Sequence, residues 1–86
     1  MLHVKDAKYL QDYMIWLSFD DGSSGEVDLS AHLNGAMFRP LKDKTFFSQV
    51  KFDSELETIV WPNGADLAPE FLKDILQKHD SKNTLR

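Results

Sequence analysis

Histidine and acidic side chains are the groups in this sequence that could do chemistry. The three histidines, His3, His32 and His79, fall in different predicted elements. No two of them have the HxH, HxxxH or HExxH spacing that brings two imidazoles to one metal ion. The chain has no cysteine, which excludes disulfides, thiolate catalysis and cysteine-based zinc sites. We therefore expect no metal and no cofactor.

Two pairs of acidic residues have spacings that could serve acid–base catalysis. Asp20 and Asp21 precede a glycine and belong to a turn, whereas Glu26 and Asp28 alternate with apolar residues on a solvated strand face. Paired carboxylates act as acid and base only where burial or proximity separates their pKa values. The serines form no G-x-S-x-G motif and the glycines form no phosphate-binding loop. The sequence predicts no catalytic residue, and we expect the protein not to be an enzyme.

The most specific local pattern is the corner at residues 60–70, with sequence VWPNGADLAPE. Pro62 cannot donate to a β-ladder and ends a strand, and the Asn-Gly pair that follows favours a turn. A proline in the first helical turn is well tolerated, so Pro69 marks a helix start. If the helix opens at Leu67, Asp66 can cap it; if it opens at Pro69, Asp66 must bond to the turn instead.

The same corner has a functional interpretation beside the folding one. Trp61, Asn63, Asp66 and Glu70 are candidates for a partner-binding or ligand-binding site, since tryptophan is enriched at protein interfaces. The folding interpretation is that the prolines, the glycine and the acid of the corner serve only to end a strand and start a helix. We favour a protein partner over a small molecule. The alternative is a small ligand-binding protein or enzyme with an acidic site at this corner.

Five segments that could position these residues have strand patterns, at residues 2–10, 13–19, 23–29, 50–52 and 58–61. Between the second and third, a three-residue loop at 20–22 pairs Ile15 with Val27 and puts Gly22 at the left-handed position that such loops require. A two-residue loop would set Leu17 opposite Glu26 instead. The three-residue loop keeps apolar residues together, and we prefer it.

The helical signals are few. Asp43 is a suitable N-cap for a short helix carrying Phe46 and Phe47. An amphipathic stripe of leucine, isoleucine and phenylalanine over residues 71–76 predicts a C-terminal helix. The expected architecture is α+β: a small antiparallel sheet of four to five strands, one short helix and one C-terminal helix. Residues 1–79 form the single domain and residues 80–86 a flexible C-terminal tail.

Bulk composition restricts the partners. The 86 residues carry a formal net charge of −4, and scattered basic residues do not favour direct nucleic-acid binding. No apolar run is long enough to span a membrane and no signal peptide precedes the domain, so we expect a cytoplasmic protein. Because so short a chain builds a modest core, a homo-oligomer or a protein partner would add stability.

Three signatures in fixed order carry a family resemblance: residues 17–22 with 27–29, residues 38–43 with 46–50, and residues 59–72. Together they resemble bacterial domain-of-unknown-function family 2442 over roughly residues 2–77. The resemblance implies a small α+β fold like the N-terminal domain of members that also carry a helix-turn-helix domain. It also implies a regulatory role, because stand-alone members are often encoded beside another small protein in a suggested toxin–antitoxin-like pairing.

Overall fold

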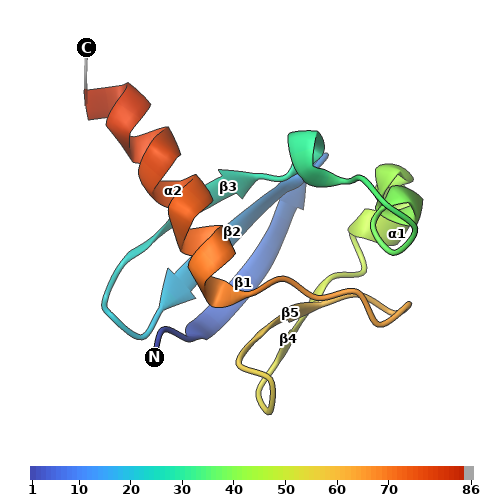
Figure 1. Ribbon diagram of the computed structural model, residues 1–86, viewed down its shortest axis with the longest axis horizontal. Helices are drawn as coiled ribbons and strands as arrows, with labels where there is room; N and C mark the ends of the chain where they lie inside the picture. Colours follow the sequence, from blue (N-terminus) through green and yellow to red (C-terminus); the bar gives the residue numbers. More distant parts are fainter. Residues whose placement is uncertain (85–86) are drawn as a thin grey trace.

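A three-stranded antiparallel meander opens the chain: β1 (Val4–Gln11), β2 (Met14–Phe19) and β3 (Ser24–Asp28), with β2 in the centre. Two 3-10 turns, η1 (Ser30–His32) and η2 (Arg39–Lys42), and the short helix α1 (Lys44–Phe47) follow the meander. The chain then forms a hairpin of β4 (Lys51–Asp53) and β5 (Thr58–Val60) and ends in the C-terminal helix α2 (Pro69–Thr84) (Figure 1). The computed structural model describes the backbone of residues 1–84 and the side chains through Leu76.

The α+β class is confirmed, and the five strands are divided between two sheets of three and two strands. The β4–β5 hairpin lies beside β1 (Figure 1). A backbone hydrogen bond between them joins the Val4 amide to the Glu57 carbonyl at 3.0 Å. The hairpin therefore adjoins the meander without extending its ladder.

The register predicted for β2 and β3 is confirmed. Ile15 pairs with Val27, and the Phe19 amide donates to the Ser23 carbonyl at 2.9 Å. Gly22 has φ +89°, which is the left-handed conformation that closes a three-residue loop. Because side chains alternate along a strand, this register turns Ile15, Leu17 and Phe19 to one face, where all three are buried.

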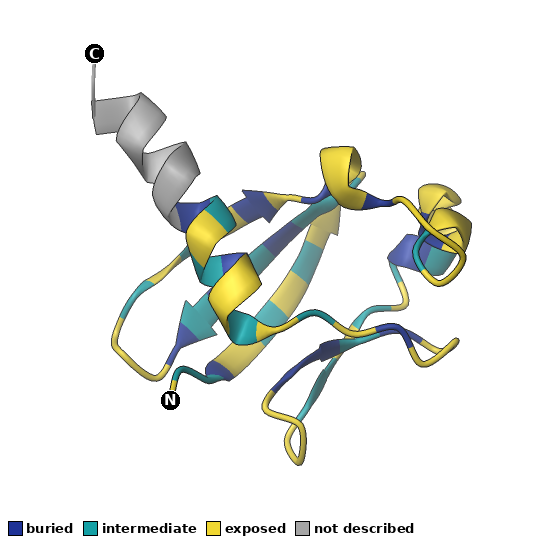
Figure 2. Ribbon diagram, viewed as in Figure 1, coloured by how far each residue is buried: buried dark blue, intermediate teal, exposed yellow. Residues whose placement is uncertain are grey.

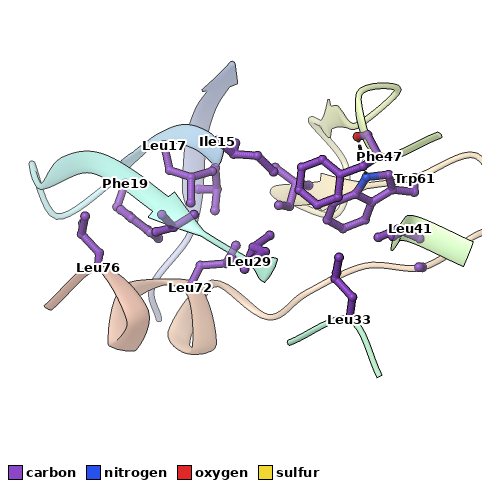
Figure 3. Packing of buried hydrophobic residues seen from close by; sticks show 14 residues of the cluster. Ile15, Leu17, Phe19, Leu29, Leu33, Leu41, Phe47, Trp61, Leu72 and Leu76 are labelled. Atoms are coloured by element: carbon purple, nitrogen blue, oxygen red, sulfur yellow. Dashed lines mark hydrogen bonds between the residues drawn. The ribbon is translucent and has the colours of Figure 1, made fainter. Parts of the chain in front are cut away.

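Helix α2 lies across the buried face of the meander (Figure 1). Leu72 and Leu76 point from α2 toward Phe19 and Leu29, while Leu33, Leu41, Phe47 and Trp61 continue the core toward α1 (Figure 3). The helix lies close to β3 at Gly25, where an added Cβ would stand 2.5 Å from Leu76 Cδ1. A glycine in β3 is therefore what lets the helix rest on the sheet.

Short helix α1 begins as predicted. The Asp43 side chain accepts a hydrogen bond from the Thr45 amide at 3.0 Å, which satisfies one of the amides left free at a helix start. Phe47 is buried and Phe46 half-buried. The cap therefore sets the direction in which α1 delivers its aromatic residues to the core.

Helix α2 runs through Thr84, so its backbone covers most of the segment predicted as a flexible tail at 80–86. Residues 85–86, and the side chains of residues 77–86 with that of His79, lie outside the described residues. Within the described part of the chain, no helix has the length and apolar character to cross a membrane.

Candidate functional site: the corner at residues 60–70

The corner is a tight reversal of the chain followed by a helix start. The Trp61 amide donates to the Ala65 carbonyl and the Gly64 amide to the Trp61 carbonyl, both at 2.9 Å. Gly64 has φ +89°, and Val60 and Asp66 form an isolated antiparallel bridge. The chain therefore turns back at residues 61–65 and pairs briefly with the end of β5 before α2 begins. The proline, asparagine and glycine of this segment predicted a turn but not this backbone pairing.

Trp61 lies inside the molecule. Its side chain is 2% exposed, and the indole Nε1 donates to the Phe47 carbonyl at 2.9 Å (Figure 3). The Trp61 and Phe47 rings also pack with their centroids 5.5 Å apart. The tryptophan thus joins β5 to α1, and its ring is unavailable to a partner in this conformation.

Asn63 holds the turn together with both ends of its amide. Its Oδ1 accepts from the Ala65 amide at 3.1 Å, and its Nδ2 donates to the Met37 carbonyl at 3.0 Å. The second bond ties the corner to the segment between η1 and η2. Asn63 is exposed, so a partner could still reach its edge, although its hydrogen-bonding groups already serve the fold.

Asp66 does not cap α2. The helix opens at Pro69, the later of the two starts considered, and the Leu72 amide donates to the Ala68 carbonyl at 3.2 Å. The Asp66 side chain does not bond to the turn either; the side chain that does is Asn63, which accepts from the Ala65 amide. Both Asp66 and Glu70 are exposed, and their carboxylates have no hydrogen-bond or ion-pair partner among the described residues.

The four predicted site residues therefore separate into two kinds. Trp61 and Asn63 maintain the fold, whereas Asp66 and Glu70 remain open to solvent. Thr58 holds the backbone between Asp66 and Glu70 in place, because its Oγ1 donates to the Leu67 carbonyl at 2.5 Å. That these residues bind a partner stays a prediction.

A second cluster, which sequence reasoning missed, surrounds His3. Its Nδ1 lies 2.9 Å from Asp20 Oδ2 and its Nε2 lies 3.4 Å from Glu57 Oε1. The His3 amide also donates to Asp20 Oδ1 at 3.0 Å. The signal in the sequence is the hairpin of the first two strands, in which the start of one strand lies beside the end of the other. Val4 pairs with Phe19 in this hairpin, after a bulge in β1, so His3 lies beside Asp20.

The His3 cluster is built to join elements. Hydrogen bonds from the His3 amide, and then from its ring, lower the pKa of Asp20 below its ordinary value of 3.8. Because each ring nitrogen faces a carboxylate, neither is directed at a nucleophile, which is the arrangement that a Ser–His pair requires. The cluster connects the β2–β3 loop, the N-terminus and the β4–β5 hairpin.

The second acid of the loop, Asp21, is also engaged in the fold. Asp21 accepts a hydrogen bond from Lys73 Nζ, which binds the loop to α2, and it accepts from the Ser23 amide at 2.9 Å. The Lys73 hydrogen bond, followed by those from Ser23, lowers the pKa of Asp21 well below 3.8. In the described part of the chain, no group of three or more metal-binding side chains is placed to hold an ion.

Comparison with known proteins identifies one family. The sequence profile of DUF2442, described as a protein of unknown function, matches residues 4–76. No curated protein and no solved structure gives a significant match. The matched range includes both sheets, α1 and the start of α2, so the chain belongs to the DUF2442 family.

Proposed function

We propose that this protein is a non-catalytic interaction or regulatory module. The observation that carries the proposal is an apolar surface that folding leaves open. Leu10, Met14 and Trp16 lie on the face of the meander opposite α2, where Leu10 is 41% exposed and the other two are half-buried. Contiguous apolar patches on the surface of a soluble domain often mark sites of interaction with another protein.

The use of acidic groups supports the same proposal. Asp20, Asp21, Asp43 and Asp53 accept hydrogen bonds that hold loops and a helix cap. Their carboxylates therefore have a structural task, and catalysis is not needed to explain their presence. Asp66 and Glu70 are the open acids of the corner, and they would suit a basic partner.

We further propose, as the specific form of this role, an antitoxin-like pairing with another small protein. An acidic module can cover a basic, nucleic-acid-binding surface on its partner and so inhibit it. The corner is the surface we assign to this contact, because its two free carboxylates need no rearrangement to meet lysine or arginine. Steering between opposite charges also speeds association at low salt.

Co-expression with the protein encoded beside it tests the pairing. We expect a complex by size-exclusion chromatography with light scattering, and we expect the double variant Asp66→Lys, Glu70→Lys to weaken it about tenfold or more. Glu55→Lys is the matched control, since Glu55 is an exposed acid in the β4–β5 loop. If no complex forms, or if the control weakens binding equally, the pairing at the corner is wrong.

A further inference from the structure

The open face of the meander, here called the outer face, is formed by the residues that alternate with the core positions. Ala7 and Tyr9 in β1 pack against the core, so Lys8 between them points away from it. Trp16 alternates with buried Ile15 and Leu17 in the same way. Figure 2 shows this alternation along β1 and β2.

The apolar residues of the outer face do not pack against the described core cluster. Met14 and Trp16 are both half-buried, yet neither is among the half-buried apolar residues that pack against the core cluster. Leu10 adds a further exposed apolar side chain beside the bulge at the end of β1. The central strand of the meander therefore presents an indole and a thioether to solvent.

Charge is distributed unevenly across this face. Lys8 pairs with Trp16, and Trp16 pairs with Glu26, so the three residues form one row across the sheet: a cation, an aromatic ring and an anion. Two strand spacings of about 4.8 Å separate the backbones of Lys8 and Glu26, and their side chains do not form an ion pair with each other. Neither has an ion-pair partner among the described residues.

From this row we infer that the outer face binds a second copy of the chain, an inference that rests on the proposed role as an interaction module. A two-fold axis parallel to the strands and passing above Trp16 turns one sheet over onto the other. It places each Lys8 opposite the partner copy's Glu26, and it brings the two Trp16 rings together at the axis. Such an interface is self-complementary, as a two-fold contact must be.

A two-fold axis parallel to the sheet but perpendicular to the strands gives an unfavourable dimer. An axis perpendicular to the strands would set β1 on β1 and β3 on β3, so Lys8 would face Lys8 and Glu26 would face Glu26. Like charges brought together at an interface cost binding energy. The polarity of the row therefore selects the parallel axis, and it selects a second copy over a uniformly charged partner.

The size of the face sets the strength of the dimer. Three strands about 4.8 Å apart and about 20 Å long give a footprint of about 300 Å² on each copy, which is below the roughly 1,200–2,000 Å² that specific, stable complexes bury in total. We therefore expect a weak, reversible dimer that dissociates at about 100 μM. This contact leaves the corner free for the small protein of the proposed pairing.

Charge reversal tests the geometry directly. The molar mass of the wild-type chain, measured by light scattering and sedimentation from low micromolar to several hundred micromolar, should rise from monomer to dimer. Lys8→Glu and Glu26→Lys should each weaken the dimer about tenfold or more, since every reversal acts at both copies of the pair. The double variant Lys8→Glu, Glu26→Lys should recover most of the wild-type affinity.

Matched controls separate the interface from general charge effects. Lys51→Glu in β4 and Glu55→Lys in the β4–β5 loop change the same charges at exposed positions away from the outer face, and they should leave the dimer unchanged. Trp16→Lys should give a monomer whose far-UV circular dichroism matches the wild type, because Trp16 is outside the core cluster. If Trp16→Lys does not fold, the recovery by the double charge reversal still decides the question.

Several results would overturn the inference. They are a wild-type chain that stays monomeric throughout, a dimer indifferent to both single reversals, or single reversals that the double variant does not rescue. A monomer that still binds the neighbouring protein would refute the dimer and leave the proposed function intact. A dimer that obeys the charge test but binds no neighbour would support this inference and count against the proposed pairing.

Discussion

Replacing Trp61 by phenylalanine separates a folding role from a binding role at the corner. The substitution keeps an aromatic ring against Phe47 but removes the indole N–H that donates to the Phe47 carbonyl at 2.9 Å. Such a neutral hydrogen bond contributes about 1 kcal/mol net to stability. That carbonyl also accepts from the Val50 amide at 3.2 Å, so the variant does not leave it without a partner, and no further desolvation cost applies.

The smaller ring adds a packing cost. Phenylalanine has three fewer side-chain heavy atoms than tryptophan, and buried apolar groups of this size contribute about 1–2 kcal/mol through transfer and cavity terms. We therefore expect Trp61→Phe to lower the free energy of unfolding by about 2–3 kcal/mol in total. A domain of this length has a stability of about 4–13 kcal/mol, so the loss is large enough to measure and small enough to leave a folded protein.

Urea unfolding followed by far-UV circular dichroism measures the change. Trp16→Phe is the matched control, because it makes the same substitution at a half-exposed residue outside the core cluster. It should cost less than about 1 kcal/mol in dilute solution. A Trp61→Phe loss within about 0.5 kcal/mol, or one equal to the control, would refute the assignment of Trp61 to the core connection between β5 and α1.

Three further changes test contacts that hold α1, α2 and the β2–β3 loop in place. Asp43→Ala removes the cap of α1 and should cost about 1 kcal/mol by urea titration, whereas Glu55→Ala, whose side chain caps nothing, should stay within about 0.5 kcal/mol. Gly25→Ala should cost about 1–3 kcal/mol and lower the thermal midpoint, since its Cβ would overlap buried Leu76; unchanged stability would show that α2 shifts freely. Because the pKa of Asp21 is lower in the folded protein than its ordinary value of 3.8, ionised Asp21 stabilises the fold at pH values above 3.8. This contribution is lost as the pH falls toward the folded-state pKa. Asp21→Asn should therefore flatten the acid-side fall in stability between about pH 4 and pH 2, and an unaltered acid profile would contradict the linkage.

Local signals in the sequence predicted a large part of the fold. The alternation in residues 13–19, together with one glycine able to take positive φ, was sufficient for the register between β2 and β3. Asp43 predicted the start of α1 by the same kind of short-range rule. Strand pairing across a tight loop and helix capping depend on residues only a few positions apart, so the sequence states them directly.

Contacts between distant segments were beyond the same reasoning. The cluster of His3, Asp20 and Glu57 brings together three segments that no periodicity connects. Trp61 looked available for binding because its sequence neighbours are turn formers. Its burial is decided by a carbonyl on α1, 14 residues earlier. The division into two sheets also depends on where the hairpin settles beside β1, which is a matter of packing.

The dependence of the core on α2 has a consequence for the newly made chain. The inner face of the meander is complete once β3 has left the ribosome, but Leu72, which covers Phe19 and Leu29, emerges more than forty residues later. At about 5–20 residues per second, that apolar face waits roughly 2–9 s for its cover. We expect ribosome-bound chains stopped at residue 60 to be cut readily by protease within β1–β3, and those that present α2 in full to resist.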